Sequence, residues 1–147
     1  MITRKRMIGR VVMTAMAGLL MAALPGHARA QISVVVASSS SASADLDAVA
    51  RMFSGQVTSW ADGSKVQLVD QSETDVGKTF YDKVLQKGSA QVRKALTALL
   101  LSGQIPKPEQ GSSDADVKAA LARLPGSIGY ISTSSLDGSV KELVRIP

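Results

Sequence analysis

Hydroxyl-bearing residues gather at two places where an apolar, strand-like run gives way to a helix-like pattern. One is the serine run 38–41, which follows the β-branched segment 32–37; the other follows the apolar segment 66–69. Hydroxyls and the backbone N–H groups at a helix N-terminus together bind small oxyanions. A ligand-free turn that merely caps the next helix is the alternative for the serine run. The candidate anion ligands are Ser38, Ser39, Ser40, Ser41, Ser72 and Thr74.

Residue types that could support catalysis or hold a metal are scarce. The sequence has no cysteine, and its single histidine, His27, lies near the N-terminus. Residues 28–147 therefore lack histidine bases, cysteine nucleophiles, disulfides and the usual zinc ligands. Two pairs of carboxylates, Asp70 with Glu73 and Asp114 with Asp116, fall at turn or cap positions, where acids are ordinarily structural. We predict a protein that is not an enzyme and needs no metal or cofactor.

The first 30 residues have the pattern of a secretory signal peptide. Four basic residues precede an apolar stretch at 11–24, and Ala28-Arg29-Ala30 supplies a small-x-small cleavage signature. The apolar stretch ends at Pro25-Gly26, short of the roughly 20 residues that a membrane-spanning helix needs. We predict cleavage near Ala30, a periplasmic location, no stable membrane span after cleavage, and one domain over residues 31–147.

Residues 1–30 account for the whole net charge of the chain. The whole chain has 17 Lys and Arg against 12 Asp and Glu, a formal charge of +5. All of that excess lies in residues 1–30, which contain five basic residues and no acid. The predicted mature domain is therefore neutral, and a nucleic-acid partner is not expected.

Hydrophobic spacing indicates four helices in the predicted domain. Leu46, Val49, Ala50 and Phe53 recur at i, i+3, i+4 and i+7, as on one helix face, with Ser43 or Asp45 as the cap. Similar spacing predicts helices over about 75–85 and 90–101, and a last helix whose stripe is Val117, Ala120, Leu121 and Leu124. Ser113, three residues before Asp116, resembles the capping box of that last helix.

Short apolar runs between these helices predict four strands, at 32–37, 66–69, 128–131 and 140–146. Strands that alternate with helices indicate an α/β fold with a small mixed, partly parallel sheet flanked by about four helices. Ligands of such folds bind beyond the carboxyl ends of parallel strands.

Three motifs, in matching order and spacing, carry a family resemblance over residues 32–146. Phe53-Ser54-Gly55-Gln56-Val57-Thr58-Ser59-Trp60 resembles the IFxGxxxxW segment of the phosphate-binding components of ABC transporters, which are type II periplasmic solute-binding proteins. Segment 79–85 is similar to the FYxxVL helix of short members. Segment 113–130 is similar to their SDxxV…PGxIGY element. The resemblance implies one lobe of that fold, binding of phosphate or another small oxyanion, and a membrane transporter or sensor as partner.

The chain departs from the family pattern in two respects. The family's R-x-x-S-G-T segment corresponds to residues 69–80, where the arginine is missing, the Ser-Gly-Thr is altered, and Glu73 and Asp75 add negative charge. The chain is also too short for two lobes. An alternative function is therefore a ligand-free periplasmic interaction module, or an accessory to a membrane transporter, sensor or envelope assembly. The five aromatic residues, Phe53, Trp60, Phe80, Tyr81 and Tyr130, all lie within the three motifs and are expected to serve mainly in packing.

Overall fold

A computed structural model describes residues 31–147, so the predicted signal peptide lies outside the described residues. The strands are β1 (Ile32–Ala37), β2 (Gln67–Asp70), β3 (Glu109–Gln110), β4 (Ser127–Ser132) and β5 (Val140–Ile146). The helices are α1 (Leu46–Phe53), α2 (Asp75–Phe80), α3 (Ser89–Leu101) and α4 (Asp114–Arg123). A π-helical turn, η1 (Tyr81–Leu85), continues α2, and a 3₁₀ turn, η2 (Thr133–Ser135), follows β4. Within residues 31–147, none of the helices combines the length and apolar character that a membrane crossing requires.

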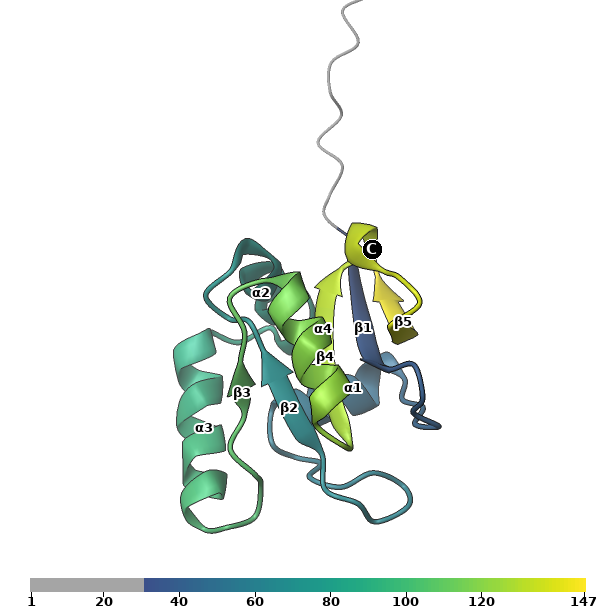
Figure 1. The fold of residues 1–147 in the computed structure, drawn as a ribbon. Helices are drawn as coiled ribbons and strands as arrows, with labels where there is room; N and C mark the ends of the chain where they lie inside the picture. Colours follow the sequence, from purple (N-terminus) through teal and green to yellow (C-terminus); the bar gives the residue numbers. More distant parts are fainter. Residues whose placement is uncertain (1–30) are drawn as a thin grey trace, which may run out of the picture.

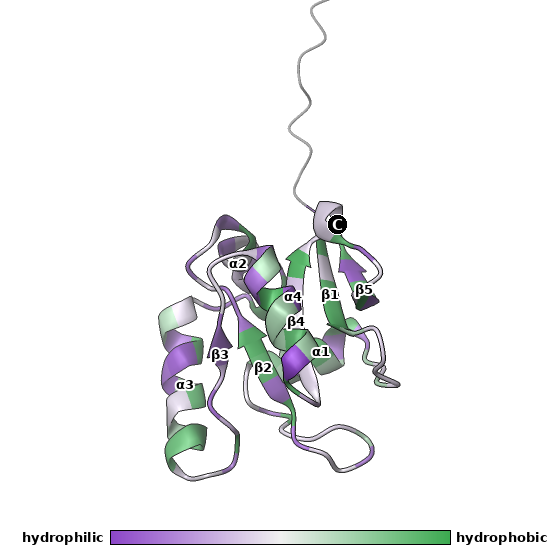
Figure 2. Ribbon diagram, in the orientation of Figure 1, coloured by the Kyte–Doolittle hydropathy of each residue, from purple (hydrophilic) through white to green (hydrophobic). Residues whose placement is uncertain are grey.

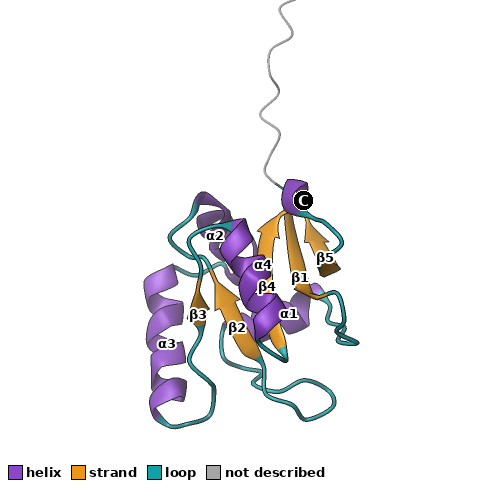
Figure 3. Cartoon of the chain, viewed as in Figure 1, coloured by secondary structure: helices purple, strands orange, loops and turns teal. Residues whose placement is uncertain are grey.

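The five strands form one open sheet in the order β3-β2-β4-β1-β5 (Figures 1 and 3). β2 pairs in parallel with both β3 and β4, whereas β1 pairs antiparallel with both β4 and β5. The predicted mixed, partly parallel α/β class is confirmed. Strand β3 was missed: it has only two residues and lies just after Pro106-Lys107-Pro108, so it has no apolar periodicity to detect.

Alternation along the strands divides the core between the two faces of the sheet. Val34, Leu68 and Tyr130 point to the face covered by α1, α2 and η1. Their neighbours Val35, Val69 and Ile131 point to the other face, which α4 covers. Helix α3 packs beside the β3 edge and joins the first face through Val92 and Leu96. Figure 2 shows the corresponding hydrophobic strands β1, β2 and β4 beside the hydrophilic β3.

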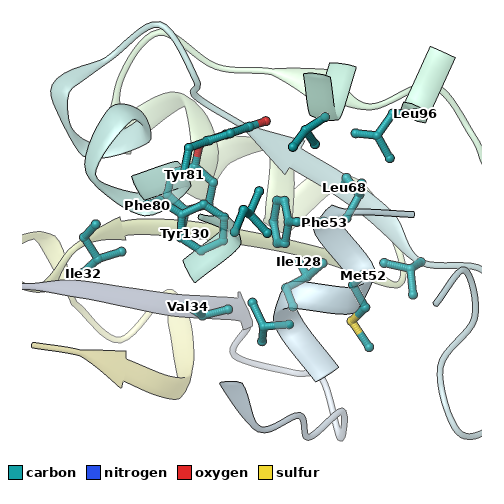
Figure 4. Packing of buried hydrophobic residues seen from close by; sticks show 14 of the residues in the cluster. Ile32, Val34, Met52, Phe53, Leu68, Phe80, Tyr81, Leu96, Ile128 and Tyr130 are labelled. Atoms are coloured by element: carbon teal, nitrogen blue, oxygen red, sulfur yellow. The ribbon is translucent and has the colours of Figure 1, made fainter. Parts of the chain in front are cut away.

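An aromatic cluster forms the centre of the larger core (Figure 4). The ring of Tyr130 stacks on Phe80 with centroids 3.9 Å apart, and Phe53 meets both rings edge-on. Trp60 is also buried and donates from its indole nitrogen to the Gly126 carbonyl at 2.9 Å. The packing role that the sequence predicts for these aromatic residues is confirmed.

Helix ends largely follow the predicted caps. Asp45 accepts from the Ala48 amide at 2.8 Å and caps α1, which decides between the two predicted caps in favour of Asp45. Ser113 accepts from the Asp116 amide and caps α4, but the Asp116 carboxylate reaches back to Ser112 rather than to Ser113. The predicted helix 75–85 needs a correction: it is α-helical only to Phe80 and widens into η1, which ends at Gln86 in the left-handed region.

Candidate functional site

A cleft of about 680 Å³ lies between α3 and strands β2 and β3, and its lining extends from Lys107 and Pro108, before β3, to Gly111 and Ser112, beyond the carboxyl end of β3. Its Ser112 end lies at the edge of the sheet where ligands of such folds bind. One part of its wall is apolar and comes mainly from α1, β2 and α3, through Phe53, Leu68, Leu96, Leu100 and Pro108. The other part is polar and consists of Asp70, Glu73, Thr74, Tyr81, Arg93, Thr97, Lys107, Gln110, Gly111, Ser112 and Asp116.

Asp70, the last residue of β2, is the most buried acid of the cleft wall, with 6% of its surface exposed. Its Oδ2 accepts a hydrogen bond from the Tyr81 hydroxyl at 2.8 Å, and its Oδ1 accepts one from the Tyr130 hydroxyl. The amide nitrogen of Gln110 lies 3.5 Å from Oδ2. Burying a carboxylate is costly unless donors surround it, so the two tyrosines are what make this position tolerable.

Tyr81 contacts Asp70 from the first residue of the π-helical turn η1. The Gln86 amide donates to the Tyr81 carbonyl at 2.8 Å, which is the i to i+5 bond of a π-helix. Phe80 and Tyr81 are consecutive, yet both are buried in the same core, and the Tyr81 hydroxyl meets the end of β2. Such π turns occur frequently at functional sites.

The surroundings of both tyrosines hold their hydroxyls in the protonated form. Burial, followed by the negative charge of Asp70, raises the pKa of Tyr81 well above its usual value of about 10, and the same two causes raise the pKa of Tyr130. A protonated hydroxyl keeps its hydrogen for Asp70. The Tyr130 oxygen also accepts from the Gln71 amide at 3.2 Å, so Tyr130 joins β2 to β4.

We therefore expect alkaline pH to destabilise the protein through these two groups. A tyrosine whose pKa is higher in the folded than in the unfolded state contributes its full stabilisation below about pH 10 and loses it as the pH rises further. The free energy of unfolding should fall above pH 10 by up to about 1.4 kcal/mol per pH unit for each tyrosine. Urea unfolding between pH 8 and 11.5 measures this, and Tyr81→Phe should reduce the slope; a flat profile to pH 11.5 would contradict the assignment.

Ser72 and Thr74, the predicted anion ligands that follow β2, make contacts within the protein. Thr74 caps α2: its hydroxyl accepts from the Gly77 amide at 3.0 Å and donates to the Gln71 carbonyl at 2.8 Å. Ser72 is buried, and its hydroxyl lies 3.5 Å from the Arg93 guanidinium. Glu73 forms an ion pair with Arg93 at 2.8 Å. Only Thr74 of the two predicted ligands lies in the cleft wall.

The predicted serine run lies at the opposite end of the sheet. β1 runs antiparallel to β4, and β2 runs parallel to β4, so the end of β1 lies at the same end of the sheet as the start of β2, with β4 between the two strands. Ser38, Ser39 and Ser41 are exposed, and Ser40 closes a turn by accepting from the Ala42 amide at 3.1 Å. The Lys141 ammonium donates to the Ser40 and Ala42 carbonyls. The structure therefore does not bring the six candidate ligands together.

Sequence reasoning also missed residues that the cleft assembles. Asp70 and Tyr81 were interpreted as a turn acid and a core aromatic, because nothing local to either residue shows that their side chains meet. Arg93 comes from the exposed face of α3, where an arginine gives no signal of its own. Within residues 31–147 no group of three or more His, Cys, Asp and Glu side chains is placed to hold a metal ion.

Comparisons with known proteins bear on the fold. No protein-family model matches the sequence, and no curated protein matches it. Among solved structures, an ABC-type phosphate transport receptor from Vibrio cholerae is similar, with TM-score 0.58 and 16% identity over 78% of this chain and 46% of that chain. A Clostridium perfringens protein, described as a phosphate ABC transporter substrate-binding protein and solved with bound phosphate, gives TM-score 0.58 and 16% identity, covering 78% and 45% of the two chains. PstS from Borrelia burgdorferi gives 0.55 and 15%, covering 78% and 47%.

The similarity establishes the fold. This chain spans less than half the length of those structures, so it corresponds to a part of them. The fold that the sequence motifs imply is therefore confirmed, at an identity too low to carry over a ligand or an activity.

Proposed function

We propose that this chain is an exported, non-enzymatic solute-binding protein whose ligand occupies the cleft between α3 and the ends of β2 and β3. The cleft itself carries the proposal. Its volume of about 680 Å³ lies within the roughly 300–1,000 Å³ of small-molecule sites, and it combines apolar walls with a few convergent polar groups. The signal-peptide pattern of residues 1–30 supports a periplasmic location, with cleavage near Ala30.

Phosphate or another small oxyanion is the ligand suggested by the three sequence motifs and by the names of the structural neighbours. In this proposal it would be delivered to a membrane transporter or sensor. The charges of the cleft weigh against tight phosphate binding, because Asp70, Glu73 and Asp116 outnumber Arg93 and Lys107. Glu73 also forms an ion pair with Arg93, whose guanidinium lies 3.5 Å from the Ser72 hydroxyl. We therefore expect phosphate to bind weakly or not at all.

A second candidate function is an interaction module that works without a solute. The internal hydrogen bonds of Thr74 favour it, since they leave that hydroxyl no hydrogen for a ligand. Leu101, at the end of α3, is 82% exposed and would suit contact with another protein. In this case the partner is a membrane transporter, sensor or envelope assembly.

Thermal unfolding of the protein separates these functions. The full chain is expressed, and the exported form is purified from the periplasm into phosphate-free buffer; its mass tests cleavage at Ala30. A solute at about 100 times its dissociation constant stabilises the folded state by about 2.7 kcal/mol and should raise the midpoint by several degrees. We expect such a rise with small organic solutes and little or none with millimolar phosphate or sulfate, relative to chloride. A rise of the midpoint with phosphate alone would support phosphate as the ligand. No rise with any solute, together with recovery of an envelope protein in a pull-down, would favour the interaction module.

A further inference from the structure

Asp70 places a negative charge at the cleft without a positive charge beside it. Its partners are the neutral hydroxyls of Tyr81 and Tyr130 and, at 3.5 Å, the neutral amide of Gln110. Among residues 31–147, no lysine or arginine forms a salt bridge with this carboxylate. A carboxylate this deeply buried is normally paired with a cation. The protein therefore supplies donors for Asp70 and leaves its charge uncompensated.

The other charges of the cleft do not reverse this field. Arg93 is neutralised by Glu73, with which it forms an ion pair at 2.8 Å. Asp116, across the cleft, accepts from the amide and hydroxyl of Ser112 and has no cationic partner within residues 31–147. Lys107 alone then offsets Asp70 and Asp116. Charges in a cleft with low-dielectric walls interact more strongly than in water, so the cleft attracts cations and repels anions.

The apolar part of the wall favours a ligand that has an apolar body as well as a charge. Leu96 and Leu100 come from α3, Leu68 from β2 and Phe53 from α1, and together they form most of the apolar lining of the cleft. Figure 4 shows the Tyr81 side chain extending toward Leu96 and Leu68, with Phe53 at the centre of the buried cluster. A hydrocarbon or aromatic body covers such a surface, whereas a bare metal ion or phosphate does not.

We propose that the solute held in the cleft is an organic cation, with a protonated amine directed at Asp70 and an apolar body against Leu68, Leu96 and Leu100. This inference rests on the proposed solute-binding function and names the ligand class of that same cleft. Selectivity follows from the uncompensated carboxylate: an amine replaces the missing counter-charge, a neutral alcohol offers only a hydrogen bond, and a carboxylate is repelled.

Three probes of matched shape and different charge test the ligand class. They are phenethylammonium, 2-phenylethanol and phenylacetate, titrated by calorimetry into the exported protein at pH 7, with amide chemical shifts recorded in parallel. We expect the cation to bind at least tenfold more tightly than the alcohol, and phenylacetate to bind most weakly. The amides that shift should belong to the cleft wall.

Variants separate the charge of Asp70 from its place in the fold. Asp70→Asn keeps the shape and one oxygen for the tyrosines, and it should reduce the preference for the cation over the alcohol to less than threefold. Asp116→Asn, at the exposed rim, should reduce it two- to threefold and serves if Asp70→Asn does not fold. Asp47→Asn on the surface of α1 makes the same change in net charge outside the cleft and should leave the preference intact.

The outcomes distinguish this inference from the function on which it rests. Equal binding of cation and alcohol, with shifts in the cleft, would overturn the organic-cation class and leave solute binding standing. So would a preference that Asp70→Asn and Asp116→Asn leave unchanged. Absence of binding by all three probes, with no shifts in the cleft, would count against both the inference and the solute-binding function.

Discussion

Replacing Gly77 with alanine is expected to destabilise the protein more than replacing any other glycine of residues 31–147 with alanine. A Cβ at this position would lie 2.0 Å from the Gln71 carbonyl oxygen and 2.7 Å from the Ser72 Cα. Both are backbone atoms of the segment that joins β2 to α2, so neither can rotate away. Overpacking of this kind costs about 3 kcal/mol. The shift would also disturb the hydrogen bond that the Gly77 amide donates to the Thr74 hydroxyl.

Urea unfolding of Gly77→Ala, with Gly138→Ala as the control, measures this cost. A Cβ at Gly138 would have no atom within 4 Å, so that variant should match the parent within about 0.5 kcal/mol. Gly77→Ala should also distort the cleft, because the segment that its Cβ would displace carries Glu73 and Thr74 of the cleft wall. A loss below about 1 kcal/mol in Gly77→Ala would show that α2 does not pack on this segment as described.

Tyr130→Phe is expected to have the second largest effect. The substitution preserves the ring stacked on Phe80 but removes the hydroxyl that donates to Asp70 and accepts from the Gln71 amide. A buried carboxylate then loses a donor and a buried amide loses its acceptor. Each such loss costs roughly 1–3 kcal/mol, so we expect a total decrease of about 3 kcal/mol in the free energy of unfolding.

A double-mutant cycle attributes this loss to Asp70. Tyr81→Phe removes one donor only and should cost about 2 kcal/mol. In an Asp70→Asn background, Tyr130→Phe should cost at least 1 kcal/mol less than in the parent, because the charge that needs the donor is gone. Equal losses in the two backgrounds would mean that the Tyr130 hydroxyl stabilises the protein independently of the Asp70 charge, through its bond with the Gln71 amide.

Local patterns were sufficient to predict most of the elements. The spacing of Leu46, Val49 and Phe53 predicts α1 with its correct start, and Asp45 is one of its two predicted caps. These predictions succeed because helix periodicity and caps depend on neighbours in the chain.

Strand pairing and the cleft depend on contacts that the sequence does not display. The serine run and Ser72 both follow strands, and only the antiparallel pairing of β1 with β4 shows that they lie at opposite ends of the sheet. The contact of Tyr81 with Asp70 likewise joins residues on two different elements, and no local pattern shows that they meet. The sequence therefore gives no signal that Asp70 belongs to the cleft.

The family motifs predicted the fold better than the ligand. Phe53, Phe80 and Tyr130 lie in those motifs and form the centre of the core, so they report packing. Most of the charged side chains of the cleft wall lie outside those motifs, at Asp70, Glu73, Arg93 and Lys107. The motifs therefore do not determine the charge of the cleft, and one fold supports many sites.

The most direct test of the account is to locate a bound solute on the protein. Intermolecular nuclear Overhauser effects between the ring protons of phenethylammonium and the isotope-labelled exported protein report contacts within about 5 Å. We predict effects to the methyl groups of Leu68, Leu96 and Leu100, and to the ring of Tyr81, that weaken in Asp70→Asn at the same concentration of probe. Effects confined to other surfaces, such as the exposed Leu101, or none at a concentration that saturates binding, would contradict the proposal that this cleft is the solute site.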